Sequence, residues 1–114
     1  MRITLLTVTL TLAGCIGQVD EDNYAQKYSP VYCQHTKQCN RGLYESEWTD
    51  LNDCVDTVTD DIEDLIDDMD DRGCDFDDDD ARECIETFAQ SDCEDYYEGD
   101  AFEDCGVNQI WDCD

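Results

Sequence analysis

Residues 49–72 read TDLNDCVDTVTDDIEDLIDDMDDR, and this stretch decides the fold. Its apolar residues recur at steps of one, three or four, while nearly every other position is Asp, Glu, Asn or Thr. This spacing predicts one amphipathic helix, with Gly73 as its C-terminal cap. Because Asp is a weak helix former and neighbouring acids repel, packing and cross-links must hold this helix. The apolar stripe comprises Leu51, Cys54, Val55, Val58, Ile62, Leu65, Ile66 and Met69.

Helical patterns also occur on both sides of this stretch. Residues 24–39 form one, in which Pro30 either kinks the helix or begins it, and residues 40–42 predict a loop after it. Residues 77–90 form another, with aspartates at its N-terminus and a buried stripe from Ala81. Beyond them we expect one or two short helical turns with loops. The sequence therefore predicts an all-α fold, a small disulfide-stapled helical bundle of three to four helices.

Length and charge limit the function. The 114 residues suffice for one small domain, whose interior is too small for a deep catalytic cleft. They include 32 Asp or Glu and 6 Lys or Arg, which gives a net charge of -26. Like charge repels nucleic acid and anionic membrane surfaces, so both are excluded as ligands. Because salt screens self-repulsion, we expect the fold to tighten as ionic strength rises.

The N-terminus has the pattern of a secretory signal. A basic start at Arg2 precedes an apolar run over residues 3–12, which is too short to span a bilayer as a helix. Two small residues and Cys15 follow this run. Two alternatives remain open. The run is a strand of the mature fold, or the signal is an ordinary one cut elsewhere, for instance after Gly17, and the protein is secreted.

The tetrad Leu12-Ala13-Gly14-Cys15 resembles the lipobox of bacterial lipoproteins. The resemblance implies that residues 1–14 are removed as a signal peptide. It also implies that the Cys15 thiol carries diacylglycerol and that the new amino group takes a further acyl chain. Two or three chains anchor a protein stably where one does not. The resemblance further implies outer-membrane sorting in a Gram-negative cell envelope, because Ile16 rather than Asp follows the lipidated cysteine.

Cysteine parity favours lipidation. Nine cysteines in 114 residues are typical of a disulfide scaffold. With Cys15 set aside, an even number remains and four disulfides can form, in any of about 105 pairings. Residues 15–22 are expected to be a lipidated tether and residues 23–114 a cysteine-rich acidic helical domain, and loss of Arg2 leaves the mature chain with a net charge of -27. The eight disulfide cysteines are Cys33, Cys39, Cys54, Cys74, Cys84, Cys93, Cys105 and Cys113.

The mature part resembles a group of small, acidic, eight-cysteine helical lipoproteins predicted in the genomes of some environmental Gram-negative bacteria. The likeness lies in residues 48–54, 81–84 and 110–113. No activity comes with this resemblance.

Calcium is the sharpest chemical hypothesis. Five acids match positions 1, 3, 5, 9 and 12 of an EF-hand loop, although Asp80 stands where glycine is needed and Arg82 where an apolar residue packs. The same acids also suit a helix start. A second frame, with Asp68, Asp70 and Gly73, lacks its third acid. Diffuse, weak binding of divalent cations by the whole surface needs no such site. The five candidate ligands are Asp75, Asp77, Asp79, Glu83 and Glu86.

Other chemistry has little support in the sequence. Cys33, His35 and Cys39 would suit zinc only if the cysteines were reduced. The chain has one histidine, no Gly-x-Ser-x-Gly elbow and no Cys-x-x-Cys, so we predict no enzyme and no cofactor. We expect a lipid-anchored envelope protein, a binding or surface-structural module without catalysis. A calcium-responsive module using residues 75–86 is the alternative.

An aromatic cluster near the C-terminus suggests a partner. Its residues either pack in the core or form a partly exposed anchor for a basic protein, because acids surround them. They are Tyr96, Tyr97, Phe102 and Trp111.

Overall fold

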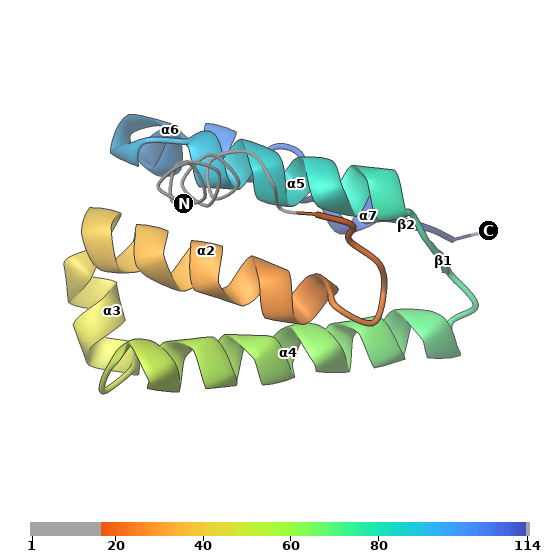
Figure 1. Ribbon diagram of the computed structural model, residues 1–114, viewed down its shortest axis with the longest axis horizontal. Helices are drawn as coiled ribbons and strands as arrows, with labels where there is room; N and C mark the ends of the chain where they lie inside the picture. The colour runs from red at the N-terminus through yellow and green to blue at the C-terminus, as the bar shows by residue number, and fades with distance from the viewer. Residues whose placement is uncertain (1–16, 114) are drawn as a thin grey trace, which may run out of the picture.

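Three long helices form the body of the domain. The computed structural model describes residues 17–113, so the signal peptide 1–14 and Cys15 lie outside the described residues. Helix α2 (Tyr24–Cys39) lies between α4 (Leu51–Asp71) and α5 (Asp78–Gln90), as Figure 1 shows. The predicted all-α, disulfide-stapled bundle is confirmed.

The two acidic helices begin and end as their sequences predict. The Asp50 side chain caps α4 by accepting a hydrogen bond from the Asp53 amide at 2.8 Å. Asp77 caps α5 in the same way through the Asp80 amide, at 2.9 Å. Gly73, with φ +78°, ends α4 in the left-handed conformation that glycine adopts at least cost. Both predicted helices are therefore confirmed to within two residues at each end.

Pro30 lies inside α2, which runs unbroken through it. The alternative in which the helix begins at Pro30 is therefore wrong. Proline removes one intrahelical donor. The Ser29 hydroxyl, directly before Pro30, donates to the Ala25 carbonyl one turn earlier at 2.7 Å, and both residues are buried. Because tertiary packing holds both faces of α2, the helix tolerates this defect.

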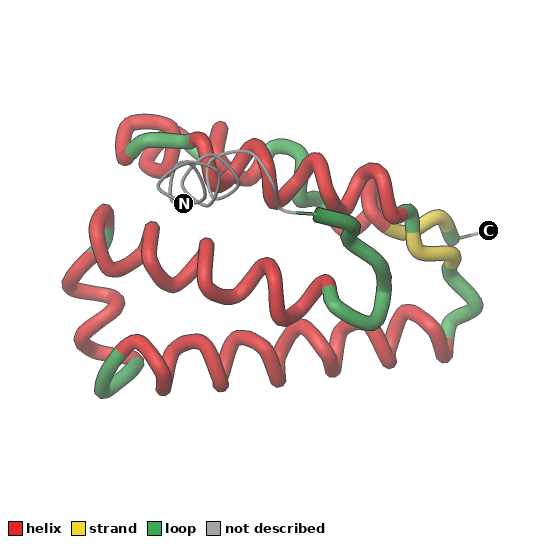
Figure 2. Tube along the Cα trace, in the orientation of Figure 1, coloured by secondary structure: helices red, strands yellow, loops and turns green. Residues whose placement is uncertain are grey.

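Short elements complete the described chain, as Figure 2 shows. The sequence predicted one or two short helical turns after residue 90, and the described chain has three short helical elements there. Two features were not predicted. A helix follows α2 where we expected a loop, because the Asn40 side chain caps it by accepting a hydrogen bond from the Leu43 amide. Two short strands also pair antiparallel. The elements are α3 (Arg41–Glu47), β1 (Asp75–Phe76), α6 (Cys93–Glu98), the 3-10 helix η1 (Asp100–Phe102), α7 (Val107–Ile110) and β2 (Trp111–Asp112).

The expected tether is folded onto the domain. Val19 is only 2 % exposed and packs in the main core cluster. The backbone then turns, because the Tyr24 amide donates to the Asp20 carbonyl at 2.9 Å. The prediction of a tether over residues 15–22 is therefore wrong for residues 17–22. One valine between polar residues shows no periodicity, so the sequence carried no sign of this packing.

Two apolar clusters make the core. The larger joins the N-terminal half of α2 to α5, β2 and the C-terminal half of α4. The smaller surrounds the Cys33–Cys54 bridge and includes Tyr44 and Val58. Tyr28 and Ile62 pack against both clusters, so the two parts of the core are continuous. Helix α2 therefore contributes side chains to both core clusters.

Candidate functional site

All eight cysteines within residues 17–113 are paired. Each bridge joins separate segments of the chain, and three of the four tie a long helix to another segment. The pairs are Cys33–Cys54, Cys39–Cys93, Cys74–Cys113 and Cys84–Cys105. The fold and its cross-links define the class of protein, a small disulfide-stapled helical domain.

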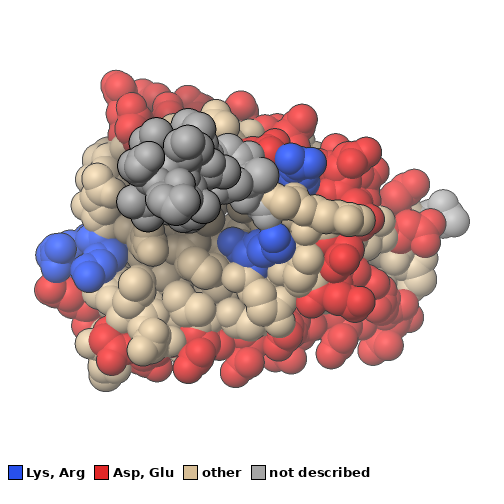
Figure 3. Space-filling model, in the orientation of Figure 1, with Lys and Arg blue, Asp and Glu red and all other residues tan. Residues whose placement is uncertain are grey.

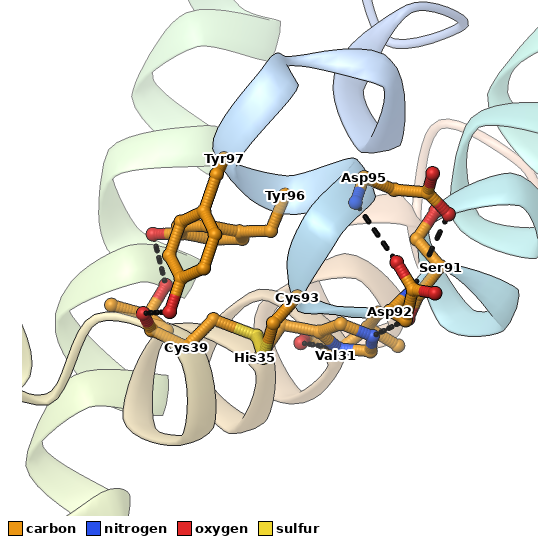
Figure 4. Close-up of a disulfide and its surroundings, with 10 residues drawn as sticks. Val31, His35, Cys39, Ser91, Asp92, Cys93, Asp95, Tyr96 and Tyr97 are labelled. Carbon is orange, nitrogen blue, oxygen red and sulfur yellow. Dashed lines mark hydrogen bonds between the residues drawn. A yellow bond between two sulfur atoms is a disulfide. The ribbon is translucent and has the colours of Figure 1, made fainter.

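The Cys39–Cys93 bridge clamps α2 to α6, as Figure 4 shows. Beside it the Tyr97 hydroxyl donates to the Cys39 carbonyl at 2.5 Å. His35 spans the same junction: its Nδ1 lies 2.9 Å from the Val31 carbonyl oxygen and its Nε2 lies 3.1 Å from the Ser91 carbonyl oxygen.

This arrangement excludes the zinc set considered from the sequence. Cys33 and Cys39 are both oxidised to disulfides, so neither offers a thiolate to a metal. Both ring nitrogens of His35 face carbonyl oxygens. His35 therefore links α2 to Ser91, the residue that follows α5, and this contact is structural.

The five acids of the calcium hypothesis do not form a loop site. Helix α5 already begins at Asp78, the fourth position of the proposed loop, so the later acids follow a helix instead of converging. Asp77 caps this helix, and Glu86 accepts from Arg82 Nε at 3.2 Å. No three of these carboxylates come within 4.8 Å of one another among the described residues.

A different acidic group does come together. One oxygen each from Asp95, Glu98 and Asp100 lie within 4.8 Å of one another at the end of α6. The Asp95 side chain also accepts from the Asp92 amide and completes a capping box, which accounts for its position. Sequence spacing did not indicate this group of acids, because Gly99 turns the chain between its members.

A shallow acidic groove of about 300 Å³ separates the N-terminal segment from α4. The carboxyl of Glu21 interacts with that of Asp70, and further carboxylates line the same groove. The hydrogen bond to Asp70, partial burial and the neighbouring charges raise the pKa of Glu21 to about 7. Protonation of Glu21 therefore relieves repulsion among the carboxylates of the groove. The groove lining comprises Glu21, Asp22, Glu63, Ile66, Asp67 and Asp70.

This pair makes a pH-dependent contribution to stability. Because the pKa of Glu21 is raised in the folded state, its contribution is complete below the ordinary value of 4.5 and is lost as pH rises through about 7. We expect the melting temperature to fall between pH 5 and pH 8, and the fall to be about 2–4 °C smaller in Glu21→Gln. Glu94→Gln, an exposed change of the same charge, is the control. Equal falls in both variants would contradict the raised pKa of Glu21.

The C-terminal aromatic residues do not form one anchor. Trp111 is 3 % exposed and packs edge-on against Tyr24 and Phe76, while Tyr96 and Phe102 lie against each other at 5.4 Å. Only Tyr97 of the four is well exposed, at 68 %. The prediction that this cluster packs in the core is therefore confirmed for Trp111, and the alternative of an exposed anchor is wrong for it.

A second groove is lined by aromatic rings. Tyr28 and Tyr32 are one turn apart on α2 and their rings stack at 5.9 Å, with 19° between their planes. The Trp48 ring stands at 90° to Tyr32, 6.5 Å away. The groove measures about 220 Å³, and α4 contributes Val58, Asp61 and Ile62 to its lining. We did not predict this groove from the sequence, although Tyr24, Tyr28 and Tyr32 recur every fourth residue.

Acidic groups dominate the surface around these features. Figure 3 shows them along α4, along the opposite edge and around the end that holds β1 and β2, with uncharged residues and a few Lys or Arg side chains between. The three arginines in residues 17–113 each pair with an acid one helical turn away. Lys37 lies over the Tyr44 ring, 5.9 Å from its centroid. Because local partners hold these four cations, most of the acidic charge faces solvent unneutralised.

Comparisons with known proteins identify no relative of the chain: no family model, no curated protein and no solved structure matches it. Within residues 17–113, no helix combines the length and the apolar character that crossing a bilayer requires.

Proposed function

We propose that the protein is a lipid-anchored domain of the bacterial cell envelope that acts by binding, without catalysis, and that its partner is a basic protein. The cysteine pairing carries this proposal. Four intramolecular bridges use every cysteine from Cys33 to Cys113, so a thiol at Cys15 is not needed for the fold. The residues before Cys15 match the signal that directs lipid attachment to such a thiol.

The surface supports the choice of partner. A mature net charge of -27 on a small domain attracts cations over roughly a Debye length, about 8 Å at physiological salt. The described arginines are already paired, so an approaching basic surface meets acids with little competition. The disulfides hold those acids in a fixed pattern despite their mutual repulsion. A fixed pattern allows selection among basic proteins, which charge alone does not.

Capture from envelope extracts tests this function. We expect the acylated protein in vesicles to retain a basic envelope protein at 0.15 M salt and to release it as the salt concentration rises. The matched control is the same chain reduced and capped with a neutral alkylating reagent, which keeps the charge and loses the fold. If the folded and unfolded chains retain the same proteins equally, the surface acts by charge alone and the proposal fails.

A further inference from the structure

The aromatic groove combines perpendicular ring faces with a carboxylate. Tyr32 and Trp48 form two walls at 90°, and Tyr28 continues the Tyr32 wall at nearly the same angle. Asp61 lies in the lining beside Val58 and Ile62. Ring faces carry negative electrostatic potential, which attracts a cation placed within about 6 Å of the ring centroid. Rings and carboxylate therefore favour the same kind of ligand.

The charge of the groove is purely negative. Burial raises the pKa of both Tyr28 and Tyr32, so their phenols stay neutral. Asp61 is thus the one acidic residue in the lining, and Glu47 adds negative potential near Tyr32. An anionic ligand would meet these charges and the field of the whole domain. A neutral apolar ligand would leave Asp61 without a partner on the ligand.

The size of the groove limits its occupant to one side chain. About 220 Å³ exceeds the volume of a lysine or arginine side chain but excludes a folded segment. The apolar stem of such a side chain packs against Val58 and Ile62, while its charged end reaches the rings and the Asp61 carboxylate. Most groove residues are half-buried, so the walls are held in place before binding.

We propose that this groove receives a lysine or arginine side chain of the basic partner, between Tyr32, Trp48 and Asp61. This inference rests on the proposed function, because it names the point at which the partner is recognised. It places specificity in one groove, whereas the remaining acidic surface supplies attraction at long range.

A titration of the intact protein with Nα-acetyl-lysine methylamide tests the groove. We expect the NMR signal of the Trp48 indole N–H to move and saturate, while that of buried Trp111 stays in place. The probe with an acetylated Nε amine is neutral and otherwise similar. We expect it to bind at least fivefold more weakly, because it loses the cation–π and carboxylate attraction. The arginine analogue is expected to behave as the lysine probe does.

Variants separate the groove from the general field. Asp61→Asn is expected to weaken binding about threefold or more, because it removes the carboxylate of the groove. Asp56→Asn makes the same change in charge about 140° around α4 and is expected to leave binding unchanged. Trp48→Leu should abolish the selectivity for the charged probe. Asp61 is exposed, so its variant keeps the test valid even if Trp48→Leu does not fold.

Several results would overturn the groove proposal. Equal binding of the charged and acetylated probes would make the groove a simple apolar pocket. Equal effects of Asp61→Asn and Asp56→Asn would leave only diffuse attraction. A concentration-dependent mass in which Trp48 becomes buried would make a second copy the occupant. In each of these cases the capture of basic proteins could still succeed, whereas failure of that capture would remove the proposed function itself.

Discussion

Replacing Cys33 and Cys54 together by alanine is expected to lower the free energy of unfolding by about 5 kcal/mol. Closing a chain segment of 21 residues contributes about 3 kcal/mol by restricting the unfolded chain. Both cysteines are fully buried in the smaller core cluster, so the emptied sulfur sites cost about 2 kcal/mol more. We expect the melting temperature, measured by circular dichroism, to fall by about 20 °C.

A mismatched pair of substitutions provides the control for this pairing. Cys33→Ala with Cys84→Ala opens two bridges and leaves Cys54 and Cys105 as free thiols. A thiol assay on the unfolded, unreduced protein should therefore find two more thiols in this variant than in Cys33→Ala with Cys54→Ala. Equal thiol counts in the two variants would show that the cysteines pair differently.

Substitution of Cys15 by serine is expected to move the protein entirely from the membrane fraction to the soluble fraction. The proposal attaches the mature chain to the bilayer through the acyl chains on this residue, and two or three chains bind far more tightly than one. Fractionation at high salt followed by immunoblotting measures the change. The fold should persist, because all four bridges form without Cys15. Ser91→Ala, a substitution outside the signal, serves as the fractionation control.

A Cys15→Ser protein that stays membrane-bound after its signal has been removed would contradict the anchor. A wild-type protein found soluble outside the cell would instead favour the ordinary signal, cut after a residue such as Gly17.

The sequence predicted the elements whose signals are local. The stripe of α4, the aspartates before α5 and the glycine after α4 each act within one or two helical turns, so the three long helices could be placed from periodicity and capping. Pro30 shows where this reasoning ends. Its local preference is against a helix interior, yet burial of α2 by neighbours on both sides keeps the helix continuous.

The missed features depend on contacts between distant residues. The β1–β2 pair places Asp75 opposite Asp112, and two like charges facing each other across strands destabilise the pairing. The Cys74–Cys113 bridge beside it brings these strands together. Val19 and Trp48 likewise owe their roles to residues far along the chain. Pairing among eight cysteines and the two grooves therefore could not be deduced from sequence spacing.

The intact mass of the membrane-extracted protein, before and after reduction, tests the central claim most directly. The account predicts a chain that begins at Cys15, carries two or three acyl chains and gains eight hydrogen atoms when its four disulfides are reduced. A full-length, unacylated chain beginning at Met1 with nine free thiols would contradict it.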